Sequence, residues 1–305
     1  IIDELLDYCE SKNIPFEVAT FRTDSIYKDG RRPEKVFFSN DKEDAKRRDF
    51  TINGLFYDPF TDKVLDYVGG VKDIHNKVIR TIGNPQDRFT EDKLRLLRAV
   101  RFSAKLDFSL DLETFLWIKK MAPSLCVVSR ERIRDEIFKI FNTSNPLKAL
   151  TLMQELDLWK PVFLFSFEEK NLRLFCALPF SLSPELKLLA LCPHLNEKDL
   201  KKMASYFKLS TKQTQKILFT LKLLSSLKDF SKLRLSLQKR IFRNPFFQEA
   251  FLFLQAYQPL MEKEEKKTMN FILLQYQQAQ NFLFYPKLIS GEDLIKLNLQ
   301  PSPLF

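Results

Sequence analysis

Two short stretches of this 305-residue sequence place acids and arginines directly beside apolar residues. They are Arg47-Arg48-Asp49-Phe50-Thr51-Ile52-Asn53 and Glu91-Asp92-Lys93-Leu94-Arg95. Arginine offers a planar fork of donors that suits a phosphate, and an ionised aspartate accepts hydrogen bonds from sugar hydroxyls. Side chains of these types could hold a nucleotide by its sugar, base and phosphates, while the apolar neighbours anchor them in a core.

Each stretch also has a simpler interpretation. An Arg-Arg-Asp sequence is more often a surface cluster of ion pairs than a ligand site. Asp92 and Arg95 are about one helical turn apart, so an acceptor and a donor fork could together match the edge of a base. The alternative is an ion pair on a helix surface, which contributes roughly 0.2–0.5 kcal/mol. The residues alone leave both interpretations open.

Helices are predicted to position both stretches. Residues 41–48 are charged and helix-compatible, and residues 49–57 are predicted as a helix packed beneath the site and ended by Asp58-Pro59. Downstream, Thr90 is predicted to cap a long helix that reaches about Leu106, with acids in its first turn, where the helix dipole favours them. At about 100° per residue, one face of this helix carries Glu91, Asp92, Arg95, Arg98 and Phe102. The opposite face carries Leu94, Leu96, Leu97, Val100 and Ala104.

Short strands are predicted around these helices. Residues 16–22 are predicted as a strand whose Glu17 faces either a site or the solvated side. Residues 23–33 are predicted as a mobile loop and residues 34–38 as a brief strand. Residues 64–68 form a predicted strand ended by a turn at Gly69-Gly70, which lacks the flanking residues of a phosphate-binding loop. Residues 78–82 are predicted as the next strand, with Asn84-Pro85 closing the hairpin.

The rest of the chain is predicted to be helical. Residues 1–12, 111–121 and 129–141 have helical spacing, and so does the sequence from Asn145 onward. Three arginines of residues 129–141 are expected to pair with neighbouring acids rather than with phosphate: Arg130, Arg132 and Arg134. The second half also carries a lysine-rich surface, which either follows an RNA backbone or is a solvated face. Its lysines include Lys198, Lys201, Lys202, Lys208, Lys212 and Lys216.

Composition restricts the class of protein. The formal charge of +10 favours phosphate-bearing partners, with general solubility as the alternative explanation. Four cysteines without paired spacing are predicted to be buried thiols: Cys9, Cys126, Cys176 and Cys192. His75 and His194 are too isolated for a histidine-based metal site. No apolar run approaches the roughly 20 residues of a membrane span and no signal peptide is evident, so a cytoplasmic protein without membrane contact is expected.

The order of several motifs carries a family resemblance. These motifs are Phe16-Glu17-Val18-Ala19-Thr20-Phe21-Arg22, Asp29-Gly30-Arg31-Arg32-Pro33, the stretch from Arg47 to Asn53, Asp66-Tyr67-Val68-Gly69-Gly70, the segment from Arg88 to Phe102, and Glu131-Arg132-Ile133-Arg134. Over about residues 14–142 the chain closely resembles the class II tRNA nucleotidyltransferase (CCA-adding enzyme) and bacterial poly(A) polymerase family. The several motifs in this order favour nucleotide binding over the simpler interpretation of each stretch.

The resemblance implies an α+β fold and a reaction. The fold would be the remnant of a nucleotidyltransferase palm with a small mixed sheet (residues 1–75), followed by a helical neck (76–144) and an all-helical, RNA-binding body and tail (145–305). The reaction would be template-independent addition of CMP and AMP to the 3′ end of tRNA from CTP and ATP. A poly(A) polymerase that adds AMP to RNA 3′ ends, a non-catalytic RNA- or nucleotide-binding remnant and a helical protein-binding scaffold are the alternatives.

The resemblance also assigns roles to residues. Arg48 and Asp49 would hold the ribose with support from Asn53, and Asp92 would pair with the base together with Arg95. Arg98 would approach the triphosphate, and Glu17 matches an acidic position beside the metal centre.

One departure from the family pattern concerns Mg²⁺. The family's opening glycine pair and its Asp-x-Asp, which binds two Mg²⁺ ions, should precede Phe16 and are absent from these residues. Two-metal phosphoryl transfer needs those carboxylates, and Asp3 and Asp7 have the wrong spacing to replace them. The chain as given is therefore expected to be inactive by itself. Its abrupt start, without a methionine or a helix cap, suggests that the chain begins inside a larger protein or has lost sequence upstream.

Overall fold

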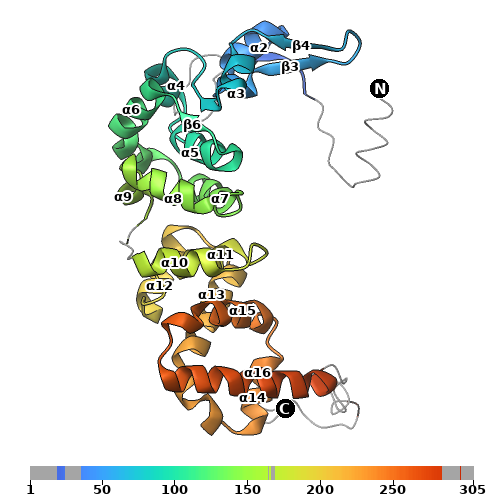
Figure 1. The fold of residues 1–305 in the computed structure, drawn as a ribbon, viewed down its shortest axis with the longest axis vertical. Helices are drawn as coiled ribbons and strands as arrows, with labels where there is room; N and C mark the ends of the chain where they lie inside the picture. The colour runs from blue at the N-terminus through green and yellow to red at the C-terminus, as the bar shows by residue number, and fades with distance from the viewer. Residues whose placement is uncertain (1–18, 25–35, 164, 166–168, 284–295, 297–305) are drawn as a thin grey trace. The chain divides into compact units, whose positions relative to one another are not determined.

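The computed structural model describes residues 19–24, 36–163, 165, 169–283 and 296 (Figure 1). The chain divides into two compact units. Unit 1 comprises Ile1–Cys176 and Ala190–Ser210, and unit 2 comprises Ala177–Leu189 and Thr211–Phe305. Helices dominate both units and the few strands are short, which confirms the predicted α+β class. The predicted boundaries after residues 75 and 144 stay predictions.

Among the described residues of unit 1, three small two-stranded sheets are present. β1 (Arg22–Asp24) pairs antiparallel with β2 (Val36–Phe38), and β3 (Leu55–Asp58) pairs antiparallel with β4 (Lys63–Asp66). β5 (Val78–Ile79) pairs parallel with β6 (Ser109–Leu110). The predicted strands near residues 34–38 and 64–68 are confirmed, although β4 starts at Lys63. The strand predicted at 16–22 lies outside the described residues up to Val18, and the observed strand begins only at Arg22.

The predicted helix over residues 49–57 is wrong. α2 (Asp41–Arg47) ends before Arg48, and Phe50 is extended and forms a bridge with Thr81. A single 3-10 turn, η1 (Thr51–Asn53), then leads into β3. The run is rich in β-branched and aromatic residues, which pack well in a strand, and the Phe50 ring is fully buried against Phe102 at 5.7 Å.

A second correction concerns the turn at Gly69-Gly70, because it begins a helix. α3 (Gly70–His75) starts where the Asp66 carboxylate accepts hydrogen bonds from the backbone N–H groups of residues 68–71 at 2.8–3.0 Å. Gly70 is required there, since a Cβ atom would lie 2.3 Å from the Thr51 carbonyl oxygen. Helix α3 therefore packs directly on η1 and fixes the turn that contains Asn53.

Asp66 makes the stability of this corner depend on pH. Burial by itself would raise the pKa of Asp66, but the four backbone donors outweigh it and lower the pKa. A carboxyl with a lowered folded pKa contributes stability above its ordinary value, and this contribution is lost as the pH falls through the folded pKa. We expect Asp66→Asn to cost about 1 kcal/mol at neutral pH, as for loss of a helix cap. The difference in unfolding free energy from wild type should shrink in strong acid; a constant difference would contradict this account.

The long helix predicted from Thr90 to Leu106 is two helices. α4 (Pro85–Glu91) is capped by Asn84, whose side chain accepts from the N–H of Gln86, and α5 (Arg95–Leu106) follows after a break at residues 92–94. Asn84-Pro85 is thus a helix start rather than the end of a hairpin. Thr90 lies inside α4 and its hydroxyl donates to the Gln86 carbonyl. The predicted apolar face is confirmed, since its members are buried: Leu94, Leu96, Leu97, Val100 and Ala104.

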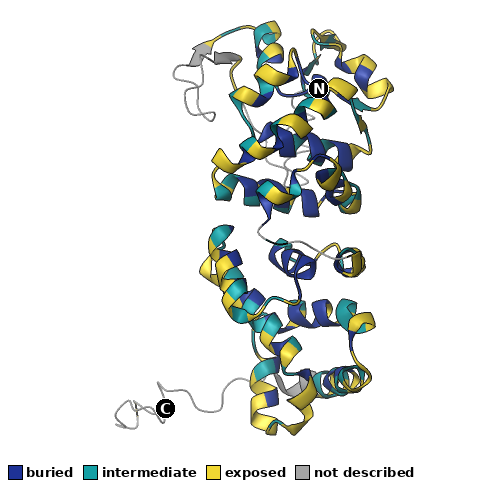
Figure 2. Ribbon diagram, turned by 90° about the vertical axis from the view of Figure 1, so that its left-hand side faces the viewer, coloured by how far each residue is buried: buried dark blue, intermediate teal, exposed yellow. Residues whose placement is uncertain are grey.

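Helices complete unit 1. They are α6 (Leu112–Met121), η2 (Ala122–Val127), α7 (Arg130–Phe141), α8 (Pro146–Glu155), α9 (Trp159–Val162), α10 (Glu169–Ala177) and α12 (Glu197–Tyr206). α5 packs on α7 and α8, and the buried residues of these helices include Leu97, Val100, Ile137 and Leu150. Figure 2 shows the buried residues of the chain in dark blue. The helical prediction for the sequence after Asn145 is confirmed wherever that sequence is described.

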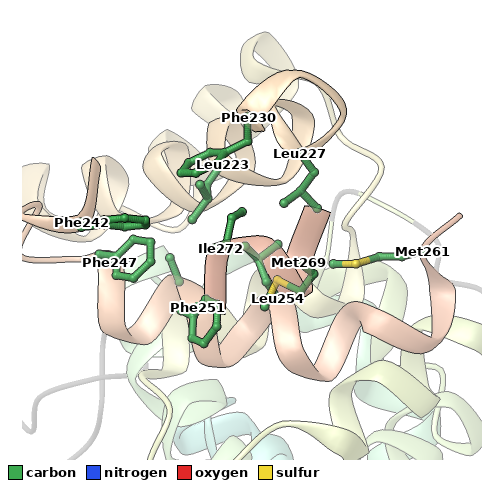
Figure 3. Close-up of a cluster of buried hydrophobic side chains, with 11 residues drawn as sticks. Leu223, Leu227, Phe230, Phe242, Phe247, Phe251, Leu254, Met261, Met269 and Ile272 are labelled. Atoms are coloured by element: carbon green, nitrogen blue, oxygen red, sulfur yellow. The ribbon is translucent and has the colours of Figure 1, made fainter. Parts of the chain in front are cut away.

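Unit 2 is built of helices around an aromatic core. Its elements are α11 (Pro184–Leu191, up to Leu189), α13 (Thr211–Ser225), η3 (Leu227–Lys232), α14 (Leu235–Phe242), α15 (Phe247–Tyr257), η4 (Gln258–Leu260) and α16 (Lys263–Leu283). Figure 3 shows Phe230, Phe242 and Phe247 packed with Ile272 and Met269. Rings of Phe242 and Phe247 meet at 5.1 Å, so the high phenylalanine content forms this core.

Two predictions about individual side chains are wrong. Lys216 does not belong to a lysine surface, because it is 9% exposed and pairs with Glu185 at 3.0 Å and Glu249 at 2.6 Å. Of the cysteines, Cys192 is buried but Cys126 and Cys176 are exposed, because η2 and α10 direct them outward; Cys9 lies outside the described residues. In the described part of the chain, no helix is both long and apolar enough to cross a membrane.

Candidate nucleotide-binding site

The two charged stretches meet at one cavity of about 520 Å³ in unit 1. It is lined by Arg47, Arg48, Asp49, Asn53, Asp92, Arg95, Arg98 and Phe102. All six nucleotide-binding residues predicted from the described sequence are therefore together, although more than forty residues separate the two stretches. Glu17 lies outside the described residues. Four arginines against two aspartates give the lining a positive surplus, which favours an anionic ligand.

Asp49 is the most connected residue of the cavity. It is 6% exposed, and one carboxylate oxygen accepts from the Asn53 side chain at 2.9 Å and the Phe50 N–H at 3.0 Å. The other oxygen pairs with Arg98, whose Nε lies 2.6 Å away. The Asp49 backbone is held as well, because its carbonyl accepts from the N–H of Ile82. The carboxylate is thus fixed between the turn after α2 and the first half of α5.

Arg48 anchors the turn that carries Asp49. Its Nε donates to Asp44 at 3.0 Å, its Nη1 donates to the Asn53 carbonyl at 3.0 Å, and its guanidinium lies 4.7 Å from the centre of the Phe56 ring. Asp44 is nearly fully buried and also accepts from Arg47. Two of the five Arg48 donors are used in these bonds, so the others can serve a ligand.

Asp92 lies in the break between α4 and α5. Its backbone is extended, and one carboxylate oxygen accepts from the Leu94 N–H at 3.1 Å. The other oxygen pairs with Arg132 of α7 at 2.8 Å. Because the residue stands outside both helices, its carboxylate is aimed by these two partners rather than by helical geometry. The sequence prediction missed both the break and the contact with Arg132.

Arg95 is more deeply buried than the sequence suggested. It is 8% exposed, and its Nη1 donates to Glu91 at 2.6 Å and to the Arg88 carbonyl at 2.9 Å. Its Nη2 donates to the Arg47 carbonyl at 3.3 Å, which ties α5 to the end of α2. The ion pair considered as an alternative therefore exists, with Glu91 as the partner. Nε and one Nη2 hydrogen remain as donors toward the cavity.

Other arginines support the cavity without lining it. Arg88 donates to the Ile82 carbonyl at 2.7 Å, pairs with Glu91 at 2.9 Å, and donates to the Lys46 carbonyl. The expectation that the arginines of α7 pair with acids is confirmed for Arg132 and for Arg134, which pairs with Asp135. Arg130 instead donates to the Pro161 carbonyl and lies over the Tyr206 ring.

Comparisons with known proteins find similar sequences and folds. Residues 4–80 match the family described as the poly A polymerase head domain, and residues 107–167 match the probable RNA and SrmB-binding site of polymerase A. A CCA-adding enzyme of Ligilactobacillus salivarius is 45% identical over 157 residues, which cover 50% of this chain and 39% of that enzyme. Over these segments the chain is similar to class II tRNA nucleotidyltransferases. It spans less than half the length of that curated relative.

Solved structures of nucleotidyltransferases show the same fold. The crystal structure of the Bacillus stearothermophilus CCA-adding enzyme in complex with CTP has a TM-score of 0.68 at 24% identity, over 94% of this chain and 70% of that one. A tRNA nucleotidyltransferase complexed with a primer tRNA and an incoming ATP analogue has a TM-score of 0.63 at 25% identity, over 81% and 76% of the two chains.

The described residues do not form the metal site that the nucleotidyltransferase family implies. Within the ranges that the structure describes, no three His, Cys, Asp or Glu side chains are grouped to hold an ion. The two cavity carboxylates are each paired with an arginine, Asp49 with Arg98 and Asp92 with Arg132. These residues therefore do not fit a Mg²⁺ ion, and no reaction step through a metal is derived from them.

Proposed function

We propose that the cavity binds a ribonucleoside triphosphate, and that the protein acts in template-independent addition of CMP and AMP to the 3′ end of tRNA. The convergence of both charged stretches on one positively charged cavity carries this proposal. Its support from known proteins is the CCA-adding relative, the similar fold solved with CTP, and the similar fold solved with primer tRNA and an ATP analogue.

Six of the eight cavity residues have a proposed role. Arg48 and Asp49 hold the ribose, and Asn53 fixes the Asp49 carboxylate through the bond at 2.9 Å. Asp92 accepts from the amino group that cytosine and adenine share, with Arg95 donating to the ring edge. Arg98 binds the triphosphate. We retain the head, neck and body boundaries at residues 75 and 144 as part of this proposal, with the lysine-rich body binding RNA.

Arg132 should act as a positioning residue for Asp92. We expect Arg132→Gln to weaken CTP binding about 3- to 10-fold, because loss of one charge-assisted bond lets the Asp92 carboxylate turn away. Calorimetric titration with CTP measures this, and Arg134→Gln in the same helix is the control because Arg134 pairs with Asp135. Equal losses in the two variants would show that Arg132 acts only through stability.

Extension of a tRNA that lacks its 3′ end tests the reaction. We propose that the 305 residues alone bind nucleotide without adding it, because the Asp-x-Asp carboxylates that two-metal transfer requires are not among them. Extension by the chain alone would contradict that part of the proposal and leave nucleotide binding intact. For an active form, products with CTP and ATP supplied separately distinguish two activities, since addition of A alone to varied RNAs would favour poly(A) synthesis.

A further inference from the structure

A second basic pocket lies at the other end of α5. It has a volume of about 540 Å³ and is lined by Arg101, Lys105, Phe138, Lys139, Asn142, Thr143 and Ser144. Its walls are the C-terminal halves of α5 and α7, which pack side by side, and the residues that follow α7 (Figure 1). None of these residues lines the nucleotide cavity, so the pocket is a separate feature.

The two sites are connected by a stripe on one helix. Arg98, Arg101, Phe102 and Lys105 follow the spacing of one α-helical face, and the first and third line the nucleotide cavity. At 1.5 Å per residue, Lys105 is about 10 Å beyond Arg98 along α5. A stacked strand advances about 3.4 Å per nucleotide, so this separation is about three nucleotides.

The cationic side chains of the pocket outnumber the acidic side chains that pair with them. Among the residues that the structure describes, Glu136 is the one acid paired with these cations; it is 2% exposed and pairs with Arg101, with the Lys139 ammonium 3.8 Å away. Lys139 is 61% exposed, and the described residues provide no hydrogen-bond or ion-pair partner for the Lys105 ammonium. Amide and hydroxyl groups of Asn142, Thr143 and Ser144 add polar atoms to this wall.

A simpler role for these lysines is to balance the helix dipoles, since cations are favoured at helix C-termini. Three backbone carbonyls near these helix C-termini already accept hydrogen bonds from side chains, however. Ser144 donates to the Ala104 carbonyl at 3.2 Å and the Lys105 carbonyl at 2.9 Å, and Thr143 donates to the Ile140 carbonyl at 2.8 Å. Three full cationic charges against one buried carboxylate then leave a surplus for an anion.

We propose that this pocket binds a backbone phosphate of the RNA strand whose 3′ end lies at the nucleotide cavity. The inference rests on the proposed function and adds to it a site and a spacing. Lysine binds phosphate as a point charge, and hydroxyl and amide groups complete the contact without selecting a base. The pocket therefore positions the strand rather than reading its sequence.

The test compares two double variants of the 305-residue chain. Lys105→Gln with Lys139→Gln removes two charges from the pocket, and Lys63→Gln with Lys72→Gln removes two exposed charges elsewhere in unit 1. Binding of a short single-stranded RNA is measured by fluorescence anisotropy across a series of salt concentrations. We expect the pocket variant to bind about 10-fold more weakly, with a salt slope reduced by about 0.7, the contribution of one phosphate contact to a single strand.

Equal RNA affinity of the two double variants would overturn the proposal. Selective loss of inorganic tripolyphosphate binding in the pocket variant, with RNA affinity unchanged, would also overturn it and identify a free polyphosphate as the ligand. CTP titration of the same proteins keeps the two proposals apart. Failure of CTP to bind the wild-type chain would contradict the proposed function, whereas the RNA comparison reports on the pocket alone.

Discussion

Replacing Lys216 with methionine should destabilise unit 2 by about 3–5 kcal/mol, because the substitution leaves two carboxylates facing each other without their cation. Lys216 pairs with Glu185 at 3.0 Å and Glu249 at 2.6 Å, and its ammonium also lies 3.2 Å from the Ser183 hydroxyl. Urea unfolding of the variant measures the loss. Lys212→Met, at an exposed position of the same helix, is the control and should change the unfolding free energy by less than about 0.5 kcal/mol.

The pKa shifts of Lys216 and Glu249 define the pH range in which their pairing contributes. Burial would lower the pKa of Lys216, but the two glutamates outweigh it and raise the pKa. Burial would raise the pKa of Glu249, but Lys216 and Ser183 lower it. The lysine contribution is therefore lost only at alkaline pH and the glutamate contribution only in acid. Adding Glu185→Gln and Glu249→Gln to Lys216→Met should recover part of the stability. No recovery would show that lost packing, rather than unpaired charge, causes the effect.

Replacing Asp49 with asparagine should weaken CTP binding about 10- to 100-fold. Asparagine has nearly the same shape, and its side-chain oxygen can still accept from the Phe50 N–H and from Asn53. It removes the charge that pairs with Arg98 and that we propose accepts from the ribose, and hydrogen bonds to charged groups contribute about 1.5–3 kcal/mol. Titration of the variant with CTP gives the affinity, and thermal unfolding reports whether the fold is retained.

The control for Asp49→Asn is Asp41→Asn, which removes an acid near the start of α2 outside the cavity. Asp41 is bonded to the Tyr67 hydroxyl, at 2.6 Å. CTP affinity of this control should match that of the wild type. If Asp49→Asn bound CTP as tightly as Asp41→Asn, Asp49 would have no role in holding the nucleotide.

Burial of one face of α5 and the set of residues that line the cavity were both predicted from the sequence, but on different grounds. The apolar spacing of Leu97, Val100 and Ala104 follows the helical period, so burial of that face could be predicted locally. The meeting of Asp49 with Arg98 depends on tertiary structure. The resemblance to a family implied that both residues bind the nucleotide, but their ion pair at 2.6 Å was not predicted.

The failures of the sequence prediction have physical causes too. Residues 50–57 form a short apolar run with no clear period, so the sequence alone does not distinguish helix from strand. The antiparallel bridge between Phe50 and Thr81 favours extended structure at Phe50. Asn84 and Thr90 are both of types that cap helices well. In the structure Asn84 is the cap, so α4 begins at Pro85 and ends at Glu91, and Asp92 lies in the break that follows. The contact between Arg132 and Asp92 joins residues forty positions apart, and no local pattern encodes it.

The central claim is that the cavity between the turn after α2 and α5 holds a nucleotide. Hydrogen–deuterium exchange of the 305-residue chain with saturating CTP and Mg²⁺ locates the ligand most directly, since binding slows exchange where the backbone is ordered. We expect slower exchange in peptides that cover residues 47–53 and 92–102, with no change at residues 138–144. Absence of protection in both segments, with CTP bound elsewhere or not at all, would contradict the account.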